Sequence, residues 1–116
     1  MANKVSWFEI MGSNGRALQQ FYGDVFGWQF EQAGEMTYGM VSAGDGGIGG
    51  AVGDSTQGNY VTVYIEVADP QAVLDDIGQK GGGTVVPVTE IPNMVTFAQF
   101  RDPEGNVVGL VKSRPE

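Results

Sequence analysis

Hydrophobic and polar residues follow the same order twice along the chain. In the first round, residues 5–11 are rich in β-forming side chains, and apolar residues then recur at three- and four-residue spacing from Arg16 to Phe26. The first pattern predicts a strand, the second predicts a helix, and Gly27 ends the helix. Three short strand patterns follow at 28–32, 36–42 and 47–52, with glycine-containing turns between them.

The second round begins after the polar stretch 53–58, which we interpret as a linker. A strand is predicted over 60–67. Asp69 and Pro70 then supply the N-cap and first-turn proline of a helix, which the glycines at 81–83 end. Further strands are predicted at 84–88, 95–101 and 106–112, the last two joined by a strongly marked turn at 102–105.

The two rounds can be overlaid, because Phe8-Glu9-Ile10 matches Ile65-Glu66-Val67. Each half is therefore predicted to be one β-α-β-β-β module. A module of this kind cannot bury both its sheet face and its helix face alone, so the two are expected to pair. We predict an α+β fold in a single domain, 1–116, with module one at about 1–53 and module two at about 59–116.

Charge narrows the range of partners. The chain carries 14 acidic and 6 basic residues, which gives a net charge of −8. This sign disfavours nucleic acid and anionic membrane surfaces, and no apolar run approaches the roughly 20 residues that cross a bilayer. No secretory leader pattern is found at residues 1–5, so a cytoplasmic location is the default expectation.

The absence of histidine and cysteine removes several kinds of chemistry. Ser-His-Asp and Cys-His nucleophiles, Cys/His zinc sites and the usual haem or iron-sulfur ligands all need these residues. Carboxylates, hydroxyls, amides, lysine and arginine remain. We therefore predict no metal and no cofactor.

Several motifs, in their order and spacing, resemble the vicinal oxygen chelate superfamily, which includes glyoxalase I, bleomycin-resistance proteins and extradiol dioxygenases. They span nearly the whole chain and comprise Trp7-Phe8-Glu9-Ile10, the helix end Phe21-Tyr22-x-x-Val25-Phe26-Gly27-Trp28, the glycine run at 46–50, Tyr64-Ile65-Glu66-Val67, and the segment 100–106. The resemblance implies two β-α-β-β-β modules that form a curved mixed sheet around a cup, with helices on the outer face. It also implies dimerisation, and we expect a homodimer.

The sequence differs from this family at the positions that hold the metal ligands. Metal-dependent members carry a histidine or glutamine early in the first strand of each module and a glutamate in the last strand. The resemblance places these positions at Trp7, Gly49, Thr62 and Gly109, of which only threonine offers a weak donor. The fold is therefore expected without the chelate chemistry.

Strand alternation predicts what lines the cup. If Phe8, Ile10 and the apolar residues 63, 65 and 67 pack under the helices, the alternate residues face inward. These ligand-binding candidates are Trp7, Glu9, Met11, Thr62, Tyr64 and Glu66, with Gln99 added by parity along its own strand. They make a largely apolar pocket with a few polar groups, which is typical of small-molecule sites. Gly49 and Gly109 are expected to widen it.

Glu9 and Glu66 are the candidate catalytic residues. If both face one cavity, desolvation and mutual repulsion are expected to raise the pKa of at least one. The alternative is that each is solvated or paired with a basic residue. Three functions remain open. The first is a metal-independent protein that binds an apolar or aromatic, possibly cationic, small molecule, and the second is a metal-free lyase or isomerase that uses Glu9 or Glu66 as general acid or base. The third is a regulatory or structural protein whose cup is vestigial and is filled by Trp7 and Tyr64. The sequence leaves open whether the protein is an enzyme.

Overall fold

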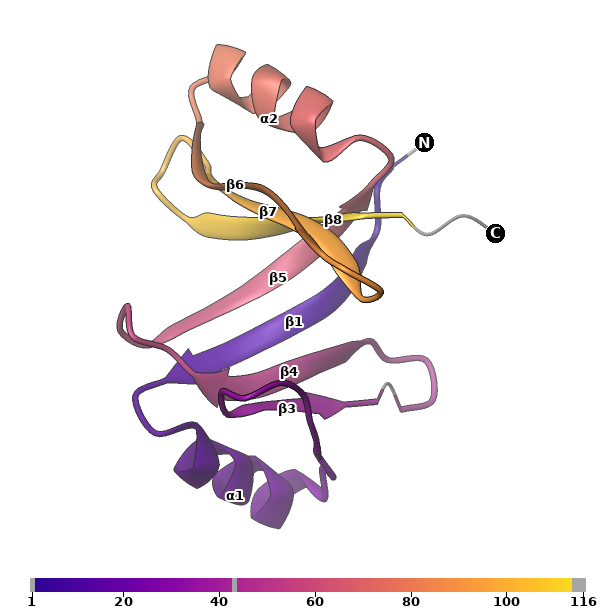
Figure 1. Cartoon of the computed structure of the whole chain (residues 1–116), viewed down its shortest axis with the longest axis vertical. Helices are drawn as coiled ribbons and strands as arrows, with labels where there is room; N and C mark the ends of the chain where they lie inside the picture. Colours follow the sequence, from indigo (N-terminus) through magenta and orange to yellow (C-terminus); the bar gives the residue numbers. More distant parts are fainter. Residues whose placement is uncertain (1, 43, 114–116) are drawn as a thin grey trace. The chain divides into compact units, whose positions relative to one another are not determined.

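A computed structural model of the protein describes residues 2–42 and 44–113. In these residues it contains eight strands and two helices (Figure 1). In chain order they are β1 (Val5–Gly12), α1 (Gly15–Phe26), β2 (Glu31–Gln32), β3 (Tyr38–Val41), β4 (Gly49–Asp54), β5 (Tyr60–Val67), α2 (Pro70–Gln79), β6 (Gly83–Ile91), β7 (Val95–Arg101) and β8 (Val107–Lys112).

The chain divides into two compact units. The first unit is Trp7–Thr62, and the second combines Met1–Ser6 with Val63–Glu116. The division falls inside β1 and β5, whereas the module boundary expected from the sequence lies in the polar linker.

In the first unit the strands follow the order β2-β3-β4-β1. β1 and β4 are parallel, with Trp7 opposite Gly49 and Phe8 opposite Gly50, while β3 is antiparallel to both β4 and β2. A parallel pair needs a long crossover between its strands. Here α1, β2 and β3 supply it.

Helix α1 begins and ends at residues suited to each terminus. The Asn14 side chain accepts a hydrogen bond from the backbone N–H of Ala17 at 3.1 Å, which satisfies a donor that the first turn leaves free. Gly27 ends the helix at a φ of 75°, a left-handed conformation that glycine adopts without steric cost. The predicted helix is confirmed to within one residue at its start.

Polar contacts hold α1 to the sheet of the first unit. The side-chain amide of the buried Gln19 donates to the backbone carbonyl of Val52 at 2.8 Å and accepts from Gln32 Nε2 at 2.7 Å. The backbone N–H of Gly15 donates to Asp54 Oδ1 at 2.6 Å. The end of β4 thus supplies a carboxylate to the first turn of the helix, where the helix dipole favours negative charge.

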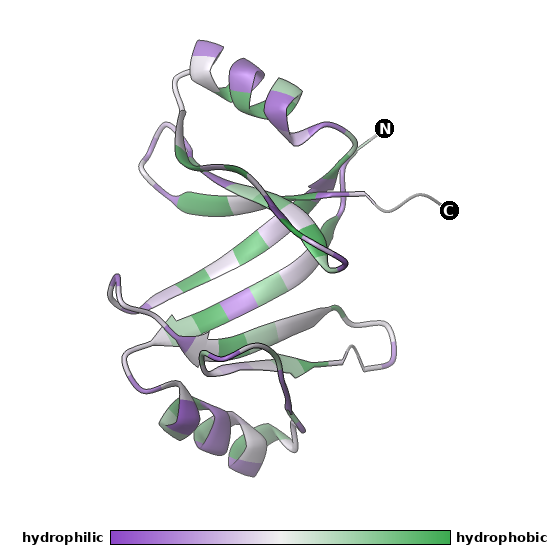
Figure 2. Ribbon diagram, viewed as in Figure 1, coloured by the Kyte–Doolittle hydropathy of each residue, from purple (hydrophilic) through white to green (hydrophobic). Residues whose placement is uncertain are grey.

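The second unit repeats this plan, with strand order β5-β8-β7-β6 and a parallel pair, β5 with β8. The core contains Val67, Leu74, Ala98 and Leu110, and partly buried apolar residues of α2, β5 and β7 pack against it. The apolar residues of α2 lie on the side that faces the strands (Figure 2). Two segments far apart in sequence also meet here, because Asn3 Nδ2 donates to the Glu66 carbonyl at 3.0 Å and the Glu66 N–H donates to the Lys4 carbonyl at 2.8 Å.

The predicted α+β fold of two β-α-β-β-β modules is confirmed. The expected strands at 60–67 and 95–101 match β5 and β7. The first module differs most, because the strand expected at 28–32 contains only Glu31 and Gln32. β4 continues through Asp54 into the expected linker, and β6 extends to Ile91 with register shifts along its pairing with β7. Among residues 2–42 and 44–113, neither helix has the length and apolar character needed to cross a bilayer.

Candidate functional site

The pleat of β1 separates its side chains between two faces. Phe8 lies on the helix side, where its ring centroid is 5.5 Å from that of Trp28. Trp28 in turn stacks on Tyr22 of α1 at 5.4 Å. Trp7 and Glu9 point to the opposite face, because both contact the same hydroxyl group on β3. This is the alternation that the sequence predicted for β1.

Glu9 is buried, with 8% of its surface exposed, and phenol groups hold its carboxylate. The hydroxyl of Tyr38 donates to Glu9 Oε2 at 2.7 Å, and the hydroxyl of Tyr60 lies 3.4 Å from Oε1. Trp7 Nε1 donates to the Tyr38 hydroxyl at 3.1 Å. An indole N–H, a phenol and a carboxylate therefore form one continuous chain of hydrogen bonds. We call Trp7, Glu9, Tyr38 and Tyr60 the Glu9 cluster.

The burial of Glu9 argues against the interpretation that this glutamate is solvated. A solvated strand residue would leave its carboxylate in water, whereas this one accepts hydrogen bonds from the protein. Short O–H to carboxylate bonds are among the stronger hydrogen bonds in proteins. Such a group is a fixed acceptor, able to bind a positively charged or hydrogen-donating ligand group or to accept a proton from a substrate.

Two glycines expected to widen the site lie against aromatic rings instead. Gly109 is opposite Tyr64 in the ladder of β5 and β8, and the Tyr64 ring occupies the space that a Cβ at Gly109 would take. Gly49 is opposite Trp7 in the ladder of β1 and β4, and a Cβ there would lie 3.2 Å from Trp7 Cζ3. The expected widening is wrong at Gly109, because the neighbouring ring fills the space that the missing side chain leaves.

The ladder register agrees with the overlay of Glu9 on Glu66, and it differs from the position, Thr62, that the resemblance gave to a ligand of the second module. The residue that faces a glycine of the last strand is Trp7 in the first unit and Tyr64 in the second. Tyr64, rather than Thr62, is therefore the register counterpart of Trp7. Thr62 is buried at 5% exposure within the first unit.

Tyr64 and Gln99 are brought together in the second unit. Gln99 Nε2 donates to the Tyr64 hydroxyl at 2.9 Å, and the Tyr64 ring meets Phe97 edge to face at 6.5 Å. Ala98 and Phe100, the neighbours of Gln99, belong to the opposite, helix-side core. Gln99 therefore points away from the helix-side core, on the side that the parity argument predicted. Glu66 is half-buried, and its backbone forms the hydrogen bonds to Asn3 and Lys4 described above.

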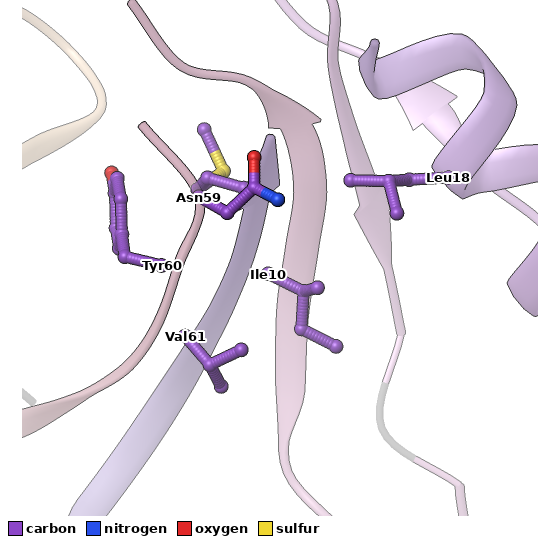
Figure 3. A pocket seen from close by; sticks show the side chains of 6 residues that line it. Ile10, Leu18, Asn59, Tyr60 and Val61 are labelled. Carbon is purple, nitrogen blue, oxygen red and sulfur yellow. The ribbon is translucent and has the colours of Figure 1, made fainter. Parts of the chain in front are cut away.

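A hollow of about 410 Å³ lies in the first unit, where β1 ends and β5 begins (Figure 3). Its lining is mostly apolar and comprises Ile10, Met11, Leu18, Asn59, Tyr60 and Val61. Met11 is the one predicted site residue among them, and Tyr60 also belongs to the Glu9 cluster. In Figure 3 the Tyr60 ring lies on the side away from Leu18. The hollow therefore adjoins the Glu9 cluster through Tyr60, and Leu18 of α1 lines it on the helix side.

Sequence reasoning missed Tyr38 and Tyr60. Tyr38 lies in the strand expected at 36–42, and Tyr60 begins the strand expected at 60–67. Alternation alone does not reveal that both hydroxyls reach Glu9, which is 29 positions from Tyr38 and 51 from Tyr60. The sequence did offer one signal for Tyr60. It lies two positions before Thr62 and four before Tyr64, so alternation along the strand puts all three side chains on one face.

The residues at the positions that the resemblance gives to metal ligands do not fit a divalent ion. The Trp7 indole is a hydrogen-bond donor only, Gly49 and Gly109 have no side chain, and Thr62 offers a neutral hydroxyl. Within residues 2–42 and 44–113, no three His, Cys, Asp or Glu side chains gather closely enough to hold an ion.

Residues 4–110 match the family described as the Glyoxalase/Bleomycin resistance protein/Dioxygenase superfamily. The match covers most of the chain and includes every strand except the end of β8. The chain belongs to this superfamily.

Curated relatives and solved structures agree with this membership. The chain is 28% identical over 115 residues to the "Putative glyoxylase CFP32" of Mycobacterium tuberculosis, a match that covers 95% of this chain and 44% of the relative. It thus spans less than half of that relative's length. Among solved structures, the fold is similar to methylmalonyl-CoA epimerase from M. tuberculosis, with a TM-score of 0.72 and 11% identity over 96% of this chain and 88% of the other.

A variant of the Streptomyces coelicolor methylmalonyl-CoA epimerase, solved in complex with 2-nitronate-propionyl-CoA, gives a TM-score of 0.71 at 18% identity. This match covers 97% of this chain and 96% of that one. At these identities the two epimerase structures establish a shared fold.

Proposed function

We propose that the chain is a metal-independent small-molecule-binding protein of the glyoxalase superfamily, which binds an apolar or aromatic ligand at the Glu9 cluster. The observation that carries the proposal is the buried Glu9 carboxylate, held by the Tyr38 hydroxyl at 2.7 Å among aromatic side chains. Apolar and aromatic walls with a few fixed polar groups are the usual composition of a ligand site. Met11, on the same strand face as Glu9, adds a polarizable side chain.

The residues at the superfamily's ligand positions support the proposal of metal independence. The superfamily positions are filled by an indole, two glycines and a hydroxyl, so the proposed ligand is held by hydrogen bonds and ring contacts. The register supports this view in the first unit, because Trp7 packs on the glycine opposite it.

Binding of small neutral aromatic molecules tests this function. We expect indole, quinoline or benzyl alcohol at millimolar concentration to shift the Trp7 indole N–H signal in a ¹⁵N NMR spectrum, with the signal assigned by comparison with Trp28→Phe. Added zinc or manganese should leave the affinity unchanged. Failure of every aromatic compound to move the Trp7 signal would contradict the proposal, as would binding that requires the metal.

The second candidate function, a metal-free lyase or isomerase, rests on the same carboxylate. A buried glutamate fixed by phenol hydroxyls can accept a proton from a bound substrate, and Tyr38 is placed to return one. Glu9→Gln separates the two functions, because the amide keeps the shape and loses the base. Turnover that disappears while binding persists would favour the enzyme, with Glu66→Gln as the matched test of the other predicted glutamate.

Homodimerisation stays a prediction. Phe21 and Val25 on α1 are 54% and 57% exposed, which is unusual for large apolar residues on one helix face. Sedimentation of the wild-type protein and of Phe21→Lys at the same concentrations tests it, since a dimer built on this face would dissociate in the variant.

A further inference from the structure

The Glu9 cluster combines a fixed negative charge with three aromatic side chains. Glu9 supplies the carboxylate, which accepts from the Tyr38 hydroxyl at 2.7 Å and lies within reach of the Tyr60 hydroxyl at 3.4 Å. Trp7 is tied to Tyr38 through its Nε1 at 3.1 Å. These hydrogen bonds place the carboxylate next to the aromatic side chains.

This composition matches one class of ligand group. A site lined by basic residues would repel a substituted ammonium ion. A carboxylate attracts it, and so do the negative faces of Trp and Tyr rings. Its methyl groups also make apolar contacts that a bare metal ion does not make. Carboxylate oxygens held by O–H donors are already oriented, so little reorganisation is needed when the cation arrives.

The charge of the whole chain acts in the same direction. With 14 acidic and 6 basic residues, the protein attracts cations and repels anions before contact. A ligand with a carboxylate or phosphate group would be repelled both by this field and by the charge of Glu9. The local and global charges therefore select the same sign of ligand.

We propose that the ligand of the Glu9 cluster carries a substituted ammonium group, which Glu9 binds by charge and Trp7, Tyr38 and Tyr60 contact through their rings. This inference rests on the proposed function, since it names the chemical class of the ligand at that site. Glu9 provides the counter-charge, and Trp7, Tyr38 and Tyr60 provide ring surface. Tyr38 also orients Glu9 through its hydrogen bond.

The test compares two molecules of the same shape. Choline and 3,3-dimethylbutan-1-ol differ in that a quaternary nitrogen replaces a quaternary carbon, so their difference in affinity reports the positive charge. We expect choline to shift the Trp7 indole N–H signal with about tenfold higher affinity than the alcohol at low salt. The preference should fall as ionic strength rises.

Variants then assign the charge to Glu9. Glu9→Gln should reduce choline affinity about tenfold and leave that of the alcohol unchanged. Glu90→Gln, the same change at an exposed position of β6, should leave the preference intact. If Glu9→Gln does not fold, the choline preference of the wild-type protein and its salt dependence still test whether the site prefers a positively charged ligand.

The outcomes separate this inference from the proposed function. Binding of neutral aromatic molecules with equal or weaker binding of choline than of the alcohol would overturn the ammonium inference and leave the binding function standing. A choline preference that survives Glu9→Gln in folded protein would overturn the assignment to Glu9. If neither choline nor any aromatic compound moves the Trp7 signal, both proposals fail.

Discussion

The ring of Tyr64 lies over the α-carbon of Gly109, in the space that a side-chain carbon at residue 109 would take. Trp7 and Gly49 form the corresponding pair in the first unit, with more room between ring and backbone. In each unit a strand position without a side chain is therefore matched by a large ring on the neighbouring parallel strand. The pairs explain why glycine at 49 and 109 does not by itself create an open space.

Gly109→Ala is expected to destabilise the protein by about 1–3 kcal/mol, because the new methyl group overlaps a rigid ring. Gly49→Ala should cost less, since the nearest Trp7 atom is 3.2 Å from the added carbon. Gly83→Ala is the control, as no heavy atom lies within 4 Å of its Cβ position. Urea unfolding measures all three, and a Gly109→Ala variant as stable as Gly83→Ala would contradict the described packing.

Tyr38→Phe is expected to lower the free energy of unfolding by about 1–2 kcal/mol, because it removes the donor to Glu9 and the acceptor of the Trp7 N–H. Tyr60→Phe should cost less, because its hydroxyl lies 3.4 Å from Glu9. The Trp7 indole proton should also shift upfield in Tyr38→Phe. Equal stability of the two variants with no change in that signal would show that the chain of hydrogen bonds is not formed.

Gln19→Leu is expected to destabilise the first unit by about 1–3 kcal/mol, although leucine is the more hydrophobic residue. The Gln19 amide satisfies the Val52 carbonyl and the Gln32 side chain, and a buried carbonyl left without its donor is costly. Gln20→Leu, on the exposed side of the same helix, is the matched control and should change little. Thermal unfolding would refute the prediction if the two variants melted together.

The turn after β7 predicts a contribution to stability that depends on pH. Hydrogen bonds from the Asn106 side chain and backbone, and from the backbone of Glu104 and Gly105, hold the pKa of Asp102 below its usual range. A carboxyl group with a lowered pKa in the folded state stabilises the protein above its unfolded pKa, and this stabilisation is lost as pH falls through the folded pKa.

Asp102→Asn should therefore be less stable than the wild-type protein at pH 7, with the difference shrinking below about pH 4. Glu104→Gln, in the same turn, is the control. NMR titration of Asp102 gives the pKa directly. A difference between Asp102→Asn and wild type that stays constant from pH 7 to pH 3 would contradict the assignment.

The fold could be predicted from sequence because each module carries local signals for each element. Asn14 and Gly27 mark the ends of α1, and Asp69 with Pro70 marks the start of α2. The strand expected at 28–32 failed for a tertiary reason. Trp28 stacks on Tyr22 and contacts Phe30, so its side chain packs against α1. Only Glu31 and Gln32 of this segment form a strand.

The candidate site was predictable in part. Alternation placed Trp7 and Glu9 on one face of β1 and Gln99 beside Tyr64, because a strand's period of two is fixed by its backbone. The partner of Glu9 was not predictable, since Tyr38 reaches it across two ladders whose registers no local pattern defines. Nor does the residue type reveal that the Tyr64 ring covers Gly109.

The bonds that Asn3 and Lys4 form with Glu66 have a consequence for how the protein is made. Asn3 precedes Glu66 by 63 positions, so this edge can close only after β5 has been made. Contacts so distant in sequence slow folding, because a long loop must be ordered before they contribute. Removing residues 3 and 4 would therefore affect the second unit, because these residues bond to its strand β5.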